Sequence, residues 1–180
     1  MDDMHKDLEW NGSLFINFVN MNSADRKMVR SWRNHAEIRK WMYTDHEITD
    51  AEHESFIVRL KDDERNYYWL VKDDNGIGLG VISLNKVDRQ NSNAYLGIYT
   101  APVEFAPVTG SRLISGIKHL AFRVLKLHTL KLEVIDENAR AKKFYLKAGF
   151  QEEGLLREFV RKDNHWLNVK ILGLINSEED

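Results

Sequence analysis

The sequence lacks several features that would each point to a class of protein. It contains no cysteine, so disulfide bonds, thiolate nucleophiles and cysteine-based metal sites are excluded. It has no excess of basic residues: 26 lysines and arginines stand against 28 aspartates and glutamates, which gives no reason to expect nucleic acid or an anionic membrane as partner. No apolar run is long enough to cross a membrane and the first residues are polar, so we expect a cytoplasmic protein.

Common catalytic and metal-binding motifs are also missing. The seven histidines are scattered and never form an HxxxH or HExxH pair, so we expect no zinc site and no bound metal. Neither GxSxG nor GxxxxGK[ST] occurs, which argues against a serine hydrolase of the nucleophile-elbow type and against a P-loop ATPase. Other patterns must therefore indicate the function.

The size of the chain indicates one domain. Its 180 residues, 43% of them hydrophobic and 30% charged, are enough to bury one sizeable core. No repeat, linker or composition shift marks a second domain. We expect a single domain over residues 1–180, with residues 1–7 and 176–180 frayed.

The most informative stretch is residues 130–150, LKLEVIDENARAKKFYLKAGF. Alternating apolar and polar residues predict that it opens as a strand. Asn138 then stands where its side chain can cap a helix, and apolar residues recur at helical spacing up to Gly149, a stop signal. Asn138 and Tyr145 are two turns apart and so lie on nearly the same side of this helix. An ordinary amphipathic strand-helix unit explains the apolar spacing but not this polar pair.

The remaining patterns predict an α/β protein with a mostly antiparallel sheet. The helix expected after residues 93–100 crosses over to the strand that begins at Leu130, which makes these two strands a parallel pair. The expected strands are 8–19, 66–72, 78–86, 93–100, 130–136, 151–160 and 166–175. The expected helices are 22–33, 50–60 after a capping box at 49–52, 110–125 and 139–148, with a short helical piece around 38–42.

This pattern carries a family resemblance. The segment that follows the strand resembles the acetyl-CoA-contacting segment of the GNAT N-acetyltransferases. The residues that match are Asn138, Ala141, Phe144, Tyr145, Gly149 and Phe150. The predicted order of elements is that of the GNAT fold, so the resemblance covers nearly the whole chain. It implies a single-domain GNAT fold with a seven-stranded mixed sheet, about four helices and a central parallel strand pair, and it implies acetyl-CoA as cosubstrate.

The helix start that should hold the pyrophosphate departs from the family pattern. Free amides and a positive dipole end suit a pyrophosphate, and we expect this helix to begin at Gly110 and Ser111. GNAT proteins usually carry Arg/Gln-x-x-Gly-x-Gly/Ala here. This sequence keeps only Gly110, with Val108 at the middle glycine and Phe105 at the basic or Gln position. Which amides face the phosphates therefore stays open.

The resemblance also implies where the pantetheine arm of CoA lies. It should bond backbone groups near Ile98 and Tyr99 and meet Asn138 on the opposite wall. A gap between two parallel strands leaves such backbone groups unpaired. Among the basic residues of the following helix, Lys143 is the one expected to help hold CoA; the alternative is a solvated helix face.

Acetyl transfer needs an oriented amine, stabilisation of a developing oxyanion and a proton for the leaving thiolate. The resemblance places the general acid on Tyr145, for which the alternative is a core tyrosine. Glu133 is a candidate base, although it is equally well interpreted as a solvated strand residue. His53 and a bound water are the other candidates, and the identity of the base stays open.

A second stretch concerns the acceptor: Trp32-Arg33-Asn34-His35 followed by Trp41-Met42-Tyr43. It resembles the nucleotide-sugar N-acetyltransferases of pseudaminic acid biosynthesis, which acetylate the 4-amino group of UDP-4-amino-4,6-dideoxy-N-acetyl-β-L-altrosamine. A UDP moiety needs cations for its diphosphate and flat apolar surface for uracil and sugar. The expected acceptor-binding residues are Arg33, Trp41, His53, Asn85, Lys86 and Tyr95. Arg33 as a helix cap and Trp41 as a core residue are the alternatives.

Two other functions compete with this hypothesis. An acetyltransferase for a protein N-terminus or a polyamine would want an open or acidic groove, and the acidic runs 62–64 and 152–153 could supply one. A non-catalytic acyl-CoA-binding module is the second, against which the retention of Tyr145 counts. The aromatic hairpin with Phe159 and Trp166 is a candidate interface for a homodimer.

Overall fold

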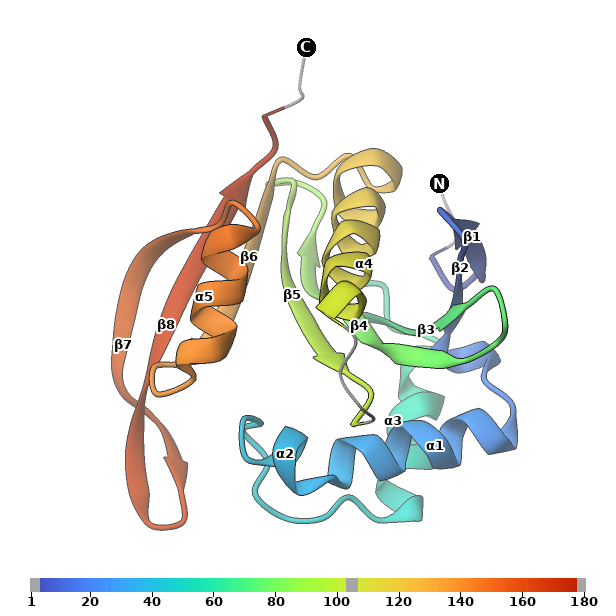
Figure 1. Ribbon diagram of the computed structural model, residues 1–180, viewed down its shortest axis with the longest axis horizontal. Helices are drawn as coiled ribbons and strands as arrows, with labels where there is room; N and C mark the ends of the chain where they lie inside the picture. The colour runs from blue at the N-terminus through green and yellow to red at the C-terminus, as the bar shows by residue number, and fades with distance from the viewer. Residues whose placement is uncertain (1–3, 103–106, 178–180) are drawn as a thin grey trace.

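One sheet runs through the whole molecule. The computed structural model describes residues 4–102 and 107–177. Within them eight strands form a single sheet in the order β1-β2-β3-β4-β5-β6-β8-β7 (Figure 1). The strands are β1 (Leu8–Trp10), β2 (Ser13–Asn17), β3 (Tyr67–Asp73), β4 (Gly78–Asp88), β5 (Asn93–Thr100), β6 (Thr129–Ile135), β7 (Gln151–Lys162) and β8 (His165–Ile175).

Helices cover both faces of this sheet. They are η1 (Phe18–Asn20), α1 (Ser23–Asn34), α2 (Ala36–Arg39), α3 (Asp50–Leu60), α4 (Pro107–Lys118), η2 (His119–Val124) and α5 (Ala139–Lys147), where η1 is a 3-10 helix and η2 a π-helix. Trp69 packs into the core formed with α4 and α5, whereas its neighbour Leu70 packs into the core formed with α1, α2 and α3. This division follows because successive strand residues point to opposite faces of a sheet.

The sheet divides where β5 meets β6. This is the one parallel pair, as predicted, and its register covers only three residue pairs, from Asn93 opposite Thr129 to Tyr95 opposite Lys131. Beyond that point β5 continues beside β4 and β6 continues beside β8. The two central strands therefore separate toward their carboxyl ends.

Predicted helix starts are confirmed at three positions. The side chain of Asn22 accepts from Asp25 N, Thr49 and Glu52 form a complete capping box, and the side chain of Asn138 accepts from Ala141 N. Each is a short polar side chain that bonds a free amide in the first turn. Local sequence alone therefore determines where these helices begin.

Two predicted boundaries are wrong. The first expected strand, 8–19, is a hairpin of β1 and β2 that turns at Asn11 and Gly12, both with positive φ, so the sheet has eight strands instead of seven. Asn-Gly is a strong hairpin signal. The helix expected to begin at Gly110 begins at Pro107, a residue that suits the first helical position because its missing N–H would be unsatisfied there in any case.

The chain is held in place from Met4 onward, earlier than the expected Leu8. Met4 is buried, and its carbonyl accepts a hydrogen bond from Asn17 Nδ2 at 2.9 Å. His5 Nε2 lies 2.9 Å from the carbonyl of Leu60. These contacts tie residues before β1 to β2 and to the end of α3.

Candidate active site

One wall of the site is the edge of β5 that faces the gap between β5 and β6. β5 pairs with β4 as far as Thr100 but with β6 only as far as Tyr95. The carbonyl of Tyr99 lies against Gly80 of β4. Because backbone groups of successive strand residues point to opposite edges, those of Ile98 point toward β6. Ile98 therefore presents an N–H and a carbonyl to the gap, as expected, whereas the backbone of Tyr99 faces the other way.

Asn138 stands on the opposite wall, at the start of α5. Its Oδ1 accepts from Ala141 N at 3.0 Å, so the oxygen is occupied by the cap. Within the described part of the chain, Asn138 Nδ2 has no hydrogen-bond partner, which leaves two donors available. One side chain thus both starts the helix and offers a donor beside the gap.

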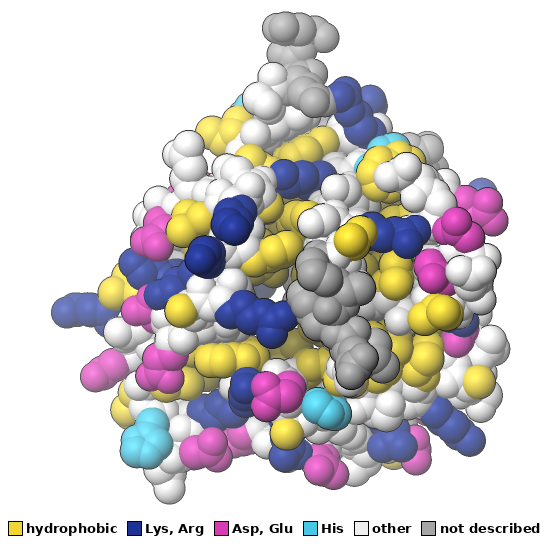
Figure 2. All heavy atoms as spheres, viewed as in Figure 1, with side chains coloured by type: hydrophobic (Ala, Val, Ile, Leu, Met, Phe, Trp, Pro, Cys, Tyr) yellow, Lys and Arg dark blue, Asp and Glu magenta, His cyan; other side chains and the backbone are white. Residues whose placement is uncertain are grey.

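The basic residues of α5 differ in their partners. Lys142 Nζ pairs with Asp136 Oδ1 at 2.7 Å, whereas Lys143 is exposed and has no ion partner among the described residues. Figure 2 shows Lys and Arg side chains gathered over α5. Lys143 is therefore placed as expected for a residue that meets an anionic ligand.

The start of α4 is arranged differently from the prediction. Since the helix begins at Pro107, the free amides of its first turn belong to Val108 and Thr109, and Gly110 already lies inside the helix. A Cβ on Gly110 would lie 3.1 Å from Cε2 of Phe144, so this glycine allows α4 to pack closely on α5. Phe105 lies outside the described residues.

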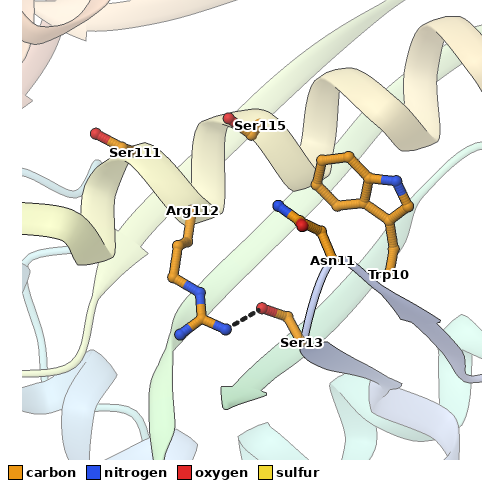
Figure 3. A pocket seen from close by; sticks show the side chains of 6 residues that line it. All are labelled: Trp10, Asn11, Ser13, Ser111, Arg112 and Ser115. Carbon is orange, nitrogen blue, oxygen red and sulfur yellow. Dashed lines mark hydrogen bonds between the residues drawn. The ribbon is translucent and has the colours of Figure 1, made fainter. Parts of the chain in front are cut away.

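Ser111 faces away from the gap. It lines a shallow groove together with residues of the β1–β2 hairpin (Figure 3). The other lining residues are Trp10, Asn11, Ser13, Arg112 and Ser115. Arg112 donates to Ser13 Oγ at 3.0 Å. The structure thus places Ser111 beside the β1–β2 hairpin, and its amide lies inside α4 instead of in the first turn.

Tyr145 lies in the core at the back of the site. It is 8% exposed, and its ring contacts those of Phe144 and Phe150 at centroid distances of 5.2 and 5.7 Å. Its hydroxyl has no hydrogen-bond partner among the described residues. Burial raises the pKa of the phenol, so it holds its proton over the whole physiological range. An unpartnered, protonated phenol is suited to donate a proton.

A polar cluster joins β4, β5, β6 and the loop between α2 and α3. Tyr43 donates from its hydroxyl to Glu133 Oε2 at 2.7 Å, and Lys86 Nζ lies 4.0 Å from Glu133 Oε1. Lys86 Nζ also lies 4.8 Å from the centroid of the Tyr95 ring. Burial, and then the bond to Glu133, raise the pKa of Tyr43, which therefore remains a donor. The structure brings Glu133, Lys86 and Tyr95 together and adds Tyr43, to which the sequence patterns assigned no role.

A second cluster surrounds Arg33 at the end of α1. Its Nη1 is buried without a hydrogen-bond partner among the described residues, and burial lowers the pKa of the guanidinium. Tyr99 and Tyr68 are the side chains whose charge states influence it, and burial raises the pKa of Tyr68 to about 12. A buried cation without a partner is costly, and an anionic ligand is the usual remedy.

His53 lies in α3, and Trp41 lies in the loop between α2 and α3. His53 is 6% exposed, its Nε2 has no partner among the described residues, and burial lowers its pKa, so the ring is neutral near pH 7. Its ring meets that of Phe18 edge-on, at a centroid distance of 6.4 Å. Trp41 is half-buried just after α2, with Lys40 Nζ 5.5 Å from its ring centroid.

Asn85 belongs to the neighbouring face of β4. Its Nδ2 donates to Ser83 Oγ at 2.9 Å, and it stands opposite Tyr95 in the sheet register. Of the six expected acceptor residues, Lys86 and Tyr95 are in direct contact with each other. Asn85 lies beside them on β4, whereas no hydrogen bond, ion pair or ring contact joins Arg33, Trp41 or His53 to this pair among the described residues. Among the described residues, no cluster of three or more metal-ligating side chains occurs, and no helix is long and apolar enough to cross a membrane.

Comparison with known proteins decides the family. Residues 16–151 match the family model described as an acetyltransferase (GNAT) domain. The chain belongs to the GNAT acetyltransferases. The match spans β2 to the start of β7 and thus includes both walls of the gap. It confirms the predicted family, fold class and enzyme class, an N-acetyltransferase that uses acetyl-CoA.

Individual members of the family resemble the chain to different degrees. Acetyltransferase PseH of Campylobacter jejuni subsp. jejuni (serotype O:2) is 37% identical over 134 residues, which cover 74% of this chain and 82% of PseH. Spermidine N(1)-acetyltransferase of Vibrio cholerae is 24% identical over 156 residues, covering 86% of this chain and 90% of the relative.

Solved structures of both relatives superpose on the model. The crystal structure of Campylobacter jejuni PseH in complex with acetyl coenzyme A has a TM-score of 0.70 at 25% identity and covers 92% of this chain and 99% of its own. Spermidine N-acetyltransferase of Vibrio cholerae, in complex with CoA and spermine, has a TM-score of 0.84 at 22% identity and covers 92% and 96%. The latter likeness shows the fold alone.

Proposed function

We propose that the protein transfers the acetyl group of acetyl-CoA to the 4-amino group of UDP-4-amino-4,6-dideoxy-N-acetyl-β-L-altrosamine, in pseudaminic acid biosynthesis. The observation that carries this proposal is Arg33 Nη1, a buried nitrogen that has no hydrogen-bond partner among the described residues. A diphosphate supplies the anionic oxygens that such a nitrogen lacks. Lys86 adds a second cation, and the 37% identity to PseH supports the same class of acceptor.

The residues around the β5–β6 gap would hold the cosubstrate. The backbone of Ile98 offers a donor and an acceptor within the gap, and Asn138 Nδ2 offers donors from the other wall. Lys143 supplies a free positive charge on the α5 side. Acetyl-CoA supplies the activated acetyl group, and these contacts hold it between the two central strands.

Proton transfer is assigned to two side chains. Tyr145, protonated because burial raises the pKa of its phenol, gives its proton to the thiolate that leaves when the amine attacks the thioester directly. Glu133 accepts the proton that the acceptor amine loses. Tyr43 and Lys86 hold the Glu133 carboxylate from two sides, which fixes its orientation toward the acceptor.

An acetyltransferase for polyamines or protein N-termini is the second candidate. The sequence match to spermidine N(1)-acetyltransferase, 24% identical over 156 residues, is the observation in its favour. A polycationic acceptor, however, needs carboxylates. In the polar cluster of Tyr43, Glu133, Lys86 and Tyr95, the carboxylate of Glu133 is already bonded by a phenol and faces a lysine. The cations of the acceptor side favour an anionic acceptor.

Steady-state kinetics with varied UDP at fixed acetyl-CoA tests the assignment. We expect UDP to compete with the sugar nucleotide and the aminosugar nucleotide to be acetylated faster than spermine or an N-terminal peptide. Failure of UDP to inhibit at millimolar concentration, together with faster acetylation of spermine or peptide, would contradict the proposal.

A further inference from the structure

The hairpin of β7 and β8 is bent toward the acceptor side. Its strands join through a two-residue turn, Asp163 and Asn164, both with positive φ, as the tight hairpin turns require. Register shifts between Leu156 and Val160, and Glu158 within that bulge has a φ of 51°. The amide of Glu158 donates to Asn168 Oδ1 at 2.8 Å, which stabilises the bulge. A bulge bends its strand and re-aims the residues beyond it.

The residue re-aimed by this bend is Lys162, the last of β7. Its Nζ lies 2.7 Å from the carbonyl of Arg39 and 3.0 Å from that of Met42. The first carbonyl belongs to the last residue of α2 and also accepts from Met42 N at 3.0 Å, and the second belongs to the loop that follows. Burial lowers the pKa of Lys162. The lysine thus gives up part of its hydration for two carbonyls of a segment 120 residues away in sequence.

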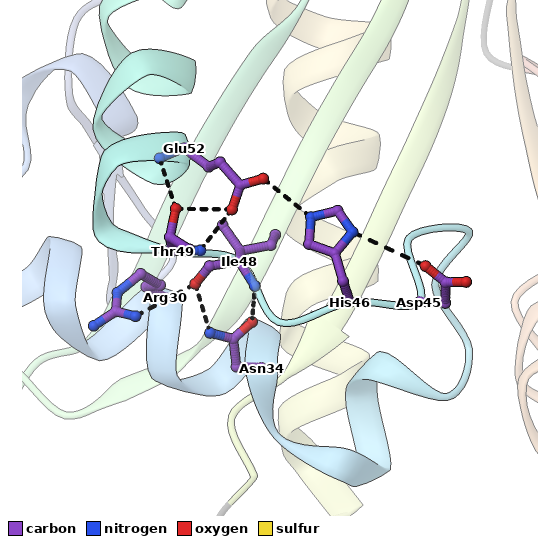
Figure 4. Close-up of polar contacts among 7 residues, drawn as sticks. All are labelled: Arg30, Asn34, Asp45, His46, Ile48, Thr49 and Glu52. Atoms are coloured by element: carbon purple, nitrogen blue, oxygen red, sulfur yellow. Dashed lines mark hydrogen bonds and ion pairs between the residues drawn. The ribbon is translucent and has the colours of Figure 1, made fainter.

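The far half of the α2–α3 loop has its own anchors (Figure 4). Ile48 exchanges two hydrogen bonds with the side chain of Asn34, both 2.8 Å long. Arg30 adds a bond of 3.3 Å to the carbonyl of Ile48. The capping box of Thr49 and Glu52 then starts α3. Residues 46–49 are therefore held to α1 and α3 without any help from the hairpin.

The near half of the loop has different supports. Within residues 39–43, Lys162 bonds two carbonyls, and the ring of Phe159 meets that of Tyr43 edge-on at 6.4 Å. Both of these contacts come from β7. Other supports are the bond from Tyr43 to Glu133, the ion pair of Arg39 with Glu47 at 3.1 Å and the packing of Met42 against the core formed with α1, α2 and α3. The hairpin therefore supplies two of the contacts that hold the loop segment that carries Tyr43 to Glu133.

We propose that Lys162 is a positioning residue for the acceptor: by holding the Arg39 and Met42 carbonyls it places Tyr43 on Glu133. This inference rests on the proposed function, in which Glu133 faces the acceptor. Lys162 acts on the acceptor side alone, because the gap between β5 and β6, Asn138 and Lys143 lie on other elements. Its loss should therefore separate the two substrates kinetically.

The test replaces Lys162 by methionine, which keeps the length of the stem and removes the donors. We expect kcat/KM for the acceptor to fall by roughly tenfold, because Glu133 loses part of the support that orients it, with an unchanged KM for acetyl-CoA. Lys162→Arg, which retains donors, should restore much of the kcat/KM for the acceptor. Lys170→Met is the matched control, because Lys170 lies on the same hairpin and pairs with Glu152 at the surface at 2.8 Å.

A second measurement needs no substrate. Hydrogen exchange of the free protein should be faster in the peptide covering residues 39–43 of Lys162→Met than in the unsubstituted protein, with residues 46–49 unchanged. Failure of the proposed function would appear as no acetylation of the sugar nucleotide by the unsubstituted protein, and exchange would still report on the loop. Unchanged exchange at 39–43, an unchanged kcat/KM for the acceptor, or a changed KM for acetyl-CoA would overturn the role of Lys162.

Discussion

The active site has two parts that are built in different ways: a cosubstrate wall around the β5–β6 gap, and an acceptor wall around Glu133 and Arg33. The cosubstrate wall consists of adjacent segments: β6 runs into α5 through Asn138, and β5 supplies backbone groups along one strand. The acceptor wall is assembled from α1, the α2–α3 loop, β4, β6 and the C-terminal hairpin, joined by single side-chain contacts. The first kind of wall depends on local helix and strand geometry, whereas the second depends on tertiary contacts across the whole chain.

The largest effect is expected at Tyr145, the buried tyrosine of α5. Tyr145→Phe removes a proton donor and almost no surface, so turnover should fall by about a hundredfold or more while acetyl-CoA affinity stays the same. Single-turnover kinetics and calorimetry measure the two quantities. Tyr67→Phe is the control, because Tyr67 is equally buried but donates to the carbonyl of Glu64. Near-normal turnover of Tyr145→Phe would make it a core tyrosine.

Arg33→Met should affect the acceptor wall alone. Loss of a charged hydrogen-bond donor to a diphosphate is expected to raise the acceptor KM by about tenfold to a hundredfold, without a change in acetyl-CoA affinity. Arg26→Met on the same helix is the control, since Arg26 pairs with Glu54 at 2.6 Å. An acceptor KM that stays constant, or improves, in Arg33→Met would favour a cationic acceptor.

In the cosubstrate wall, Asn138 has two functions that substitutions can separate: capping α5 and binding acetyl-CoA. Asn138→Ala removes the cap and should cost about 1 kcal/mol of unfolding free energy, besides weakening acetyl-CoA binding. Asn138→Asp keeps an oxygen for the cap and removes the Nδ2 donor, so it should retain stability and lose cosubstrate affinity. Chemical denaturation and calorimetry provide the two values. Equal acetyl-CoA affinity in Asn138→Asp would mean that Asn138 serves only as a cap.

The smallest expected effect concerns pH and His53. Burial lowers its pKa from the ordinary value of 6.5, so between the folded and unfolded pKa values the unfolded state binds more protons. Stability should therefore decline as pH falls below 6.5, and His53→Gln should decline less. Urea midpoints measured at two pH values, one above and one below 6.5, test this expectation. His165→Gln, on the exposed hairpin turn, should behave like the unsubstituted protein.

Sequence patterns predicted the cosubstrate wall well. The cap at Asn138, the helix that carries Tyr145 and the parallel pair all follow from spacing and capping chemistry within short windows. The errors there came from turn chemistry that was present in the sequence: Asn11-Gly12 divides the first strand, and Pro107 starts α4 before Gly110. Ser111, expected at the start of this helix, consequently lies in its second turn.

For the acceptor wall, sequence patterns predicted individual residues but not the contacts between them. Lys86, Tyr95 and Glu133 were all identified as separate candidates, yet nothing in their spacing indicates that they meet. The bond between Tyr43 and Glu133 spans 90 residues, and that of Lys162 to Met42 spans 120. No periodicity predicts such pairs, because they depend on how the bulged hairpin and the loop pack.

The separation of β5 from β6 also has a mechanical consequence. The sheet consists of two half-sheets, β1 to β5 in one and β6, β8 and β7 in the other, and three residue pairs between β5 and β6 join them. A ligand that lies in the β5–β6 gap and bonds both half-sheets would link them where β5 and β6 are not paired. Cosubstrate at about a hundred times its Kd would add close to 3 kcal/mol to the free energy of unfolding of the protein. Acetyl-CoA would thus be a structural link between the two half-sheets as well as a reactant.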